Sequence, residues 1–114
     1  MRLLVVDNDK DSADSLVALA EAMGHEAFTA YDGATALKTA RESMFDLILL
    51  DINLGETDGR EICAGIRREG LSQQAHIIAI TGHTGVEDTL NLGDFHGYAL
   101  KPLEFDRLEE LLTS

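Results

Sequence analysis

The chain has 114 residues, 45% of them hydrophobic, and a formal net charge of −12 from 21 acidic and 9 basic residues. This length fits one domain with one core, and the hydrophobic content excludes a disordered chain. The negative charge disfavours a nucleic-acid partner, because binding to phosphates needs a basic surface. It is compatible with a domain that binds a cation or docks on a basic protein surface.

The single cysteine, Cys63, excludes an internal disulfide and favours a reducing compartment. It lies beside Ile62 in a helical pattern, so we interpret it as a core residue. We expect no signal peptide, because a strand begins directly after Met1 and Arg2. No hydrophobic run reaches the roughly 18 residues that span a bilayer. These features predict a soluble, cytoplasmic protein without membrane contact.

In chain order, the first apolar run covers residues 3–6, and a helical pattern follows it. Leu16, Leu19 and Met23 share one face of that helix, and Gly24 ends it. A second strand is expected over 27–30. The helix after it begins near Asp32 and presents Leu37, Ala40 and Met44 on one face.

The second half of the chain continues the alternation. Strands are expected over 47–52, 77–80 and 98–100. Helical spacing places Ile62 and Ile66 on one face before Gly70, and 84–92 is a weaker helical segment. The last helix carries Phe105, Leu108, Leu111 and Leu112. We predict one α/β domain over residues 1–114, with five parallel strands in a doubly wound sheet and helices on both faces.

Chemically active side chains follow four of these strands. Asp7 ends the first strand, Asp51 the third and Thr81 the fourth, while Lys101 and Pro102 follow the fifth. In an open parallel sheet, ligands bind beyond the carboxyl ends of the strands. Two carboxylates can hold Mg²⁺, and lysine and threonine can contact a phosphoryl group, so this set fits a phosphotransfer site.

The segment LLVVDNDKD raises a question of its own, because it crowds Asp7, Asn8, Asp9 and Asp11 at the end of a buried strand. Like charges 4 Å apart repel by roughly 4 kcal/mol at an effective dielectric constant near 20. Either these residues form a solvated helix cap or a cation lies among them.

Five segments resemble the receiver domains of two-component response regulators, over essentially the whole chain. They are LLVVDND (3–9), YDGATAL (31–37), DLILLDINLGETDG (46–59), IIAITG (77–82) and GYALKP (97–102). The resemblance is to receivers of hybrid sensor kinases or single-domain regulators. It implies a flavodoxin-like (β/α)5 fold with strand order 2-1-3-4-5.

The resemblance also implies a role for each matching residue. Asp51 would be the phosphoacceptor, and its phosphoryl group would come from a phosphohistidine of a sensor histidine kinase or a histidine phosphotransfer protein. Asp7, Asp51 and the backbone carbonyl of Asn53 would hold Mg²⁺. Lys101 would pair with the phosphoryl group.

Further roles concern the response to phosphorylation and the surrounding loops. Thr81 would approach the phosphoryl group, and Tyr98 would fill the space that Thr81 leaves. Gly59 would serve the tight loop after Asp51, and the Lys101–Pro102 bond would be cis. The implied protein is not a turnover enzyme and is a monomer or a weak dimer.

The chain departs from the family pattern at several positions. Asn8 stands where most receivers have a second acid, which predicts weaker Mg²⁺ binding. Gly55 replaces a proline, which loosens that turn. The stretch from Thr81 to Lys101 is about two residues short, which predicts a short fourth helix. His83 occupies a position that influences phosphoryl lifetime in the family, and we expect the four histidines to form no metal cluster.

Three other interpretations remain open. A receiver-like interaction module that no longer cycles phosphate would account for Asn8 and the altered fourth helix. A haloacid-dehalogenase-type phosphatase would use Asp7-Asn8-Asp9 as its Asp-x-Asp motif, although it leaves Asp51 without a role. A flavodoxin-like cofactor binder shares the topology, yet no phosphate loop rich in Gly, Ser or Thr follows the first strand.

Overall fold

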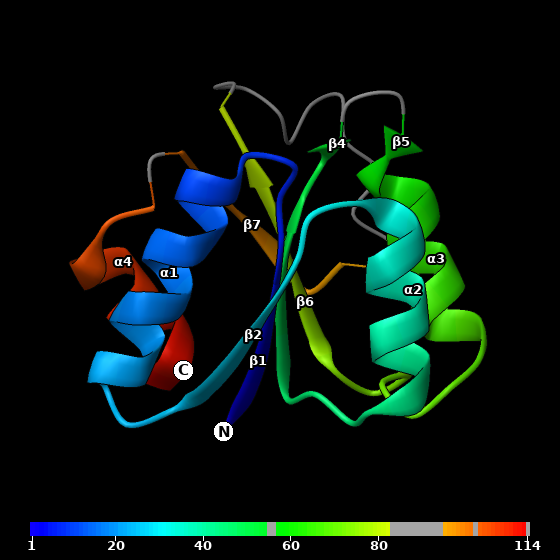
Figure 1. The fold of residues 1–114 in the computed structure, drawn as a ribbon, viewed down its shortest axis with the longest axis horizontal. Helices are drawn as coiled ribbons and strands as arrows, with labels where there is room; N and C mark the ends of the chain where they lie inside the picture. Colours follow the sequence, from blue (N-terminus) through cyan, green and yellow to red (C-terminus); the bar gives the residue numbers. More distant parts are fainter. Residues whose placement is uncertain (55–56, 83–94, 102, 114) are drawn as a thin grey trace.

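The computed structural model describes residues 1–54, 57–82, 95–101 and 103–113. Its elements in chain order are β1 (Arg2–Val6), α1 (Lys10–Ala22), β2 (Glu26–Ala30), α2 (Gly33–Glu42), β3 (Leu47–Asp51), β4 (Asn53–Leu54), β5 (Thr57–Asp58), α3 (Gly59–Arg68), β6 (His76–Thr81), β7 (Gly97–Leu100) and α4 (Phe105–Thr113). Figure 1 shows the sheet between two helical layers, with α1 and α4 on one side and α2 and α3 on the other.

Five strands form one sheet in the order β2-β1-β3-β6-β7, and every neighbouring pair is parallel. This confirms the doubly wound sheet, and the order is the one that the resemblance implies. The sequence did not predict the short antiparallel pair β4–β5, in which Asn53 lies opposite Asp58. That pair follows β3 directly and therefore shapes the surroundings of Asp51.

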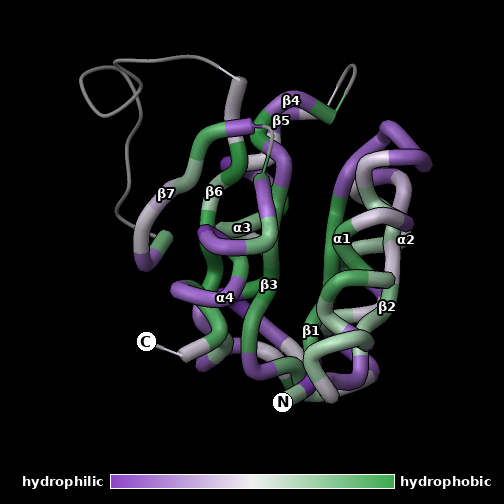
Figure 2. Tube along the Cα trace, turned by 90° about the vertical axis from the view of Figure 1, so that its left-hand side faces the viewer, coloured by the Kyte–Doolittle hydropathy of each residue, from purple (hydrophilic) through white to green (hydrophobic). Residues whose placement is uncertain are grey.

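Alternate residues of the central strands enter two separate hydrophobic clusters, one on each face of the sheet. In β1, Leu4 and Val6 face α2 and α3, whereas Leu3 and Val5 face α1 and α4. All five residues of β3 are buried, and Figure 2 shows β3 as a hydrophobic stretch inside the molecule. Burial on both faces explains why these strands are nearly continuous hydrophobic runs.

The helix boundaries follow local capping chemistry. The side chains of Asp9, Asp32 and Asp58 accept backbone N–H bonds at the starts of α1, α2 and α3, as aspartate does at N-caps. Gly24 and Gly70 have φ angles of +91° and +100° just after α1 and α3, which confirms the predicted helix ends.

The expected helix faces are confirmed with two exceptions. Ile62 and Ile66 of α3 and Leu108 and Leu112 of α4 are buried, and Cys63 is fully buried as expected. Met44 is 62% exposed because α2 ends at Glu42, before the periodic pattern does. Phe105 is 45% exposed because it is the first residue of α4.

Several predictions fall on residues 55–56, 83–94 and 102. The helix over 84–92, the loosened turn at Gly55, the role of His83 and the cis bond before Pro102 therefore lie outside the described residues. Within the described part of the chain, every helix is too short or too polar to cross a membrane.

Candidate functional site

The parallel sheet brings three of the predicted side chains into direct contact at its carboxyl edge. Lys101 Nζ lies 2.9 Å from Asp51 Oδ2 and 3.1 Å from Asp7 Oδ2. The two carboxylates are almost fully buried, whereas the lysine side chain is 32% exposed. One ammonium group therefore bridges two buried acids, and the trio keeps one net negative charge.

Backbone amides fix the other oxygen atom of each carboxylate. Asp7 Oδ1 accepts a hydrogen bond of 2.9 Å from the Asp9 amide, and Asp51 Oδ1 accepts one of 3.0 Å from the Asn53 amide. In both cases the donor is two residues further along the chain, as in an Asx-turn. The two carboxylates are thus held in matching orientations, with one oxygen toward Lys101.

These contacts shift the proton affinities of the site. Burial raises the pKa of Asp51, and the nearby Asp7 carboxylate adds to this, while Lys101 and the Asn53 amide act in the opposite direction. For Lys101, burial lowers the pKa, but its bonds to Asp51 and Asp7 outweigh burial and raise it. Lys101 is therefore a stable ammonium group at neutral pH.

Thr81 lies at the same edge of the sheet, at the end of β6. It is 6% exposed, and its carbonyl oxygen accepts a 2.7 Å bond from the Lys101 amide. With Asn8, Asp51, Asn53 and Lys101 it lines a cavity of about 380 Å³. The residues after each strand, Ile52 and Gly82, complete its wall, and their place next to Asp51 and Thr81 was the only signal for them in the sequence.

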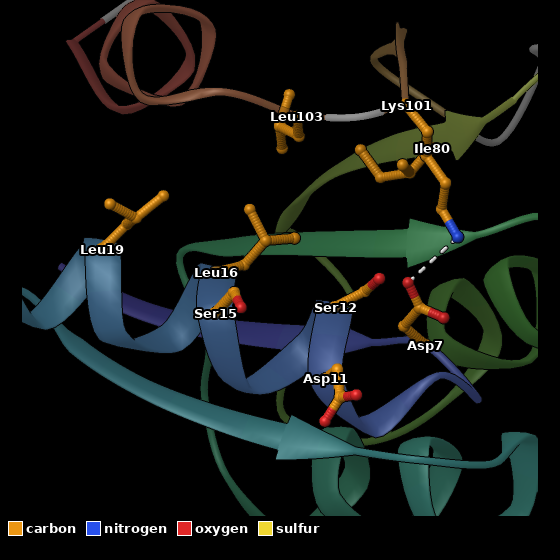
Figure 3. Close-up of a pocket in the computed structure, with 9 residues that line it drawn as sticks. All are labelled: Asp7, Asp11, Ser12, Ser15, Leu16, Leu19, Ile80, Lys101 and Leu103. Atoms are coloured by element: carbon orange, nitrogen blue, oxygen red, sulfur yellow. Dashed lines mark ion pairs between the residues drawn. The ribbon is translucent and has the colours of Figure 1, made fainter.

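A second cavity, of about 510 Å³, opens on the α1 side of the Asp7–Lys101 ion pair. Figure 3 shows Ser12, Leu16 and Leu19 of α1 along one wall and Leu103 on the other. Lys101 therefore lines both cavities, the polar one beside Asp51 and the more apolar one beside α1.

The crowded acids after β1 divide into two roles. The Asp9 side chain accepts bonds from the Asp11 and Ser12 amides and so caps α1. Asp7 instead faces Lys101. The two interpretations of this segment therefore both apply. Asp9 caps a helix, and Asp7 faces a cation, the ammonium group of Lys101.

Gly59 allows α3 to start against the backbone that carries Asp51. A Cβ atom on Gly59 would lie 2.5 Å from the carbonyl oxygen of Asp51 and 2.8 Å from the Cα of Ile52. The Gly59 amide also donates a 2.8 Å bond to the Ile52 carbonyl. The tight loop predicted for Gly59 is this close approach of two backbones.

A family model described as the response regulator receiver domain matches residues 3–113. The chain belongs to this family. The fold of the receiver and the resemblance seen in the sequence are thereby confirmed.

Two curated relatives each contain a segment similar to this chain. The transcriptional regulatory protein ZraR of Salmonella typhimurium is 37% identical over 113 residues, which are 96% of this chain and 25% of ZraR. The signal transduction histidine-protein kinase BarA of Escherichia coli is 32% identical over 114 residues, which are 98% of this chain and 12% of BarA. The receiver thus spans a quarter or less of the length of these relatives.

Among solved structures, the response regulator protein TrrA of Thermotoga maritima superposes with a TM-score of 0.86 and 30% identity. The match covers 98% of this receiver and 96% of TrrA, which was crystallised in complex with Mg²⁺ and BeF.

The donor set of this receiver fits a magnesium ion. Two buried carboxylates share only one ammonium group, and Mg²⁺ prefers oxygen ligands and keeps several of its waters. No group of three or more His, Cys, Asp or Glu side chains in the described residues is arranged to hold a metal. An ion here would therefore have few carboxylate ligands and keep part of its water shell.

Tyr98 lies on β7, half-buried, and packs against the hydrophobic cluster beneath α2 and α3. Its carbonyl oxygen accepts a 3.4 Å bond from Arg107 of α4. This position is compatible with movement between the core and the surface, and its role as a switch stays a prediction.

Proposed function

We propose that this receiver accepts a phosphoryl group on Asp51 from a phosphohistidine of a sensor histidine kinase or a histidine phosphotransfer protein. The observation that carries the proposal is the bridge from Lys101 to two buried carboxylates, of which Asp51 lines the polar cavity. A buried acid beside a fixed ammonium group is a poor packing residue but a well-placed nucleophile.

In the transfer, a carboxylate oxygen of Asp51 forms a bond to phosphorus while the bond between phosphorus and the partner's imidazole nitrogen breaks. The electron pair of that bond returns to the imidazole, which takes up a proton. Lys101 neutralises negative charge on the phosphoryl oxygens, and the Thr81 hydroxyl donates a hydrogen bond to one of them. Bound Mg²⁺ would supply further charge neutralisation at the same oxygens.

Asp7, Asp51 and the carbonyl of Asn53 would hold the ion, and Asn8 would contribute an amide oxygen at a position of reduced charge. Phosphorylation would then change the contacts of Thr81 and Tyr98 and so alter binding to a downstream protein. We expect no turnover of a separate substrate. The acidic surface favours protein partners over nucleic acid for this chain.

Acetyl phosphate with Mg²⁺ tests the proposal by intact-mass measurement. The expected result is a gain of one phosphoryl group, absent in Asp51→Asn and unchanged in Asp106→Asn, a matched removal of one exposed acid on α4. Beryllofluoride with Mg²⁺ should perturb Thr81 and Tyr98 in NMR spectra of the wild-type chain.

A second candidate function rests on Asn8, which lines the polar cavity without a negative charge. It is an interaction module that does not cycle phosphate. Absence of label at saturating acetyl phosphate would favour it. Turnover of phosphomonoesters that depends on Asp7 but not on Asp51 would instead favour the phosphatase interpretation.

A further inference from the structure

Two histidines stack at the edge of the sheet opposite to Asp51. His76 begins β6, and His96 directly precedes β7. Their ring centroids are 4.1 Å apart, and the ring planes differ by 15°. This pair lies at the amino ends of two strands whose other ends lead to the candidate site, since Thr81 ends β6 and Lys101 follows β7.

Arg67, near the end of α3, ties this pair to the neighbouring loop. Its Nη2 lies 2.8 Å from His96 Nδ1, and its Nη1 donates to the carbonyl oxygens of Gln73 and Ala75. One guanidinium group therefore connects α3, the loop before β6 and the residue before β7.

A second donor points at the same histidine nitrogen. The Ile77 amide lies 3.3 Å from His96 Nδ1, while the His96 amide donates a 2.8 Å bond to the Ile77 carbonyl. Guanidinium and amide groups can only donate hydrogen bonds. His96 Nδ1 must therefore be an acceptor, which requires a neutral ring with its hydrogen on Nε2.

The charged groups around His96 oppose its protonation. The His96 side chain is exposed, yet partial desolvation where it packs lowers its pKa first, and the charges of His76 and Arg67 lower it further. Glu69, two residues after Arg67, pairs with Arg41, and the Asp46 side chain accepts from the Arg2 amide while its carbonyl accepts from the His76 amide. Asp94 lies outside the described residues, so its contribution is tested by substitution below.

We propose that His96 is a pH-sensitive clasp at the amino end of β7. By clasp we mean a hydrogen-bond acceptor that joins the residue before β7 to α3 and β6 only while its ring is neutral. Protonation at Nδ1 removes the acceptor for Arg67 and for the Ile77 amide, and places a positive charge against the guanidinium group. The His96 side chain then loses its attachment to α3 and β6. This inference is independent of phosphotransfer at Asp51.

The direction of the pH effect follows from linkage. A group whose pKa is lowered in the folded state binds fewer protons there than in the unfolded chain. The stabilisation by His96 is therefore complete above the ordinary value of 6.5 and is lost as pH falls through the lower folded pKa.

NMR of the whole chain tests the clasp directly. Long-range ¹H–¹⁵N spectra near neutral pH should show His96 with an unprotonated Nδ1 and a protonated Nε2. The ring should titrate below 6.5, and the Ile77 amide resonance should move with the same midpoint. A ring protonated at Nδ1 near neutral pH, or a midpoint at or above 6.5, would overturn the proposal.

The matched variant is His96→Asn, whose Oδ1 lies at the position of the imidazole Nδ1 and can accept from Arg67 but cannot titrate, with His76→Asn as the comparison. Between about pH 7.5 and about pH 5, where histidine titrates, protection of the Ile77 amide should fall several-fold more in the wild type than in His96→Asn. The difference should persist in an Asp94→Asn background. Equal losses in both chains, or tight Zn²⁺ binding by the two imidazoles, would contradict the clasp.

Discussion

Lys101 Nζ lies 2.9 Å from Asp51 Oδ2, although the two residues are 50 positions apart in the chain. The same nitrogen also reaches Asp7, so one cation balances two acids that would otherwise repel each other inside the fold. We therefore expect the stability of the domain to be coupled at this point to the binding of a second cation.

Removing the charge of Lys101 tests this coupling. Lys101→Met should destabilise the domain by about 2 kcal/mol, because two buried carboxylates lose their charged partner. Millimolar Mg²⁺ should restore more stability to the variant than to the wild type, because the ion then takes the place of the ammonium group. Urea unfolding with and without Mg²⁺ measures both effects. The exposed Lys38→Met is the matched control, and an equal Mg²⁺ response in all three chains would contradict the coupling.

Asn8 determines the negative charge of the polar cavity. Asn8→Asp should tighten Mg²⁺ binding about fivefold or more, because one added charge about 4 Å away contributes between ~1 and ~4 kcal/mol. Isothermal titration calorimetry measures the affinity directly. Asp9→Asn removes a neighbouring acid that only caps α1, so it should leave the affinity nearly unchanged. Unchanged affinity in Asn8→Asp would place this residue outside the metal site.

Gly59 is required by the close approach of α3 to the backbone after Asp51. Gly59→Ala should cost about 1–3 kcal/mol, because the added Cβ meets backbone atoms that cannot move independently. Gly82→Ala is the matched control, since its Cβ would meet nothing within 4 Å. Thermal unfolding distinguishes the two variants, and equal stabilities would mean that the loop adjusts freely.

Asp58 contributes a pH-dependent term to stability. Its bonds to Arg60 hold its pKa below the ordinary value of 3.8, so its contribution is present above that value and is lost as pH falls through the folded pKa. Asp58→Asn keeps an acceptor for the cap of α3 but loses the ion pair, which should cost about 0.5 kcal/mol at neutral pH for an exposed pair. The difference between wild type and variant should shrink as pH falls below 3.8, as measured by thermal unfolding; a difference that stays constant as pH falls would assign it to the cap instead.

Much of the fold could be predicted because its determinants are local. The continuous hydrophobic runs at 3–6 and 47–50 are typical of strands buried on two faces, and both form such strands. The helix ends at Gly24 and Gly70 depend on a left-handed backbone that glycine adopts without cost. The predicted placement of Met44 and Phe105 on apolar helix faces was wrong for a related reason, because periodicity does not show where a helix begins or ends.

The amino-acid sequence by itself determined the strands, the caps and which reactive residues follow each strand. Only the tertiary structure decided which of them touch, because contact between Asp7, Asp51 and Lys101 depends on the order and register of strands far apart in the chain. The β4–β5 pair, the separation of Asp9 from the site and the stacking of His76 on His96 depend on the same long-range packing. Local propensity does not determine contacts between residues that are far apart in the chain. Burial of the sheet between two helical layers fixes those contacts.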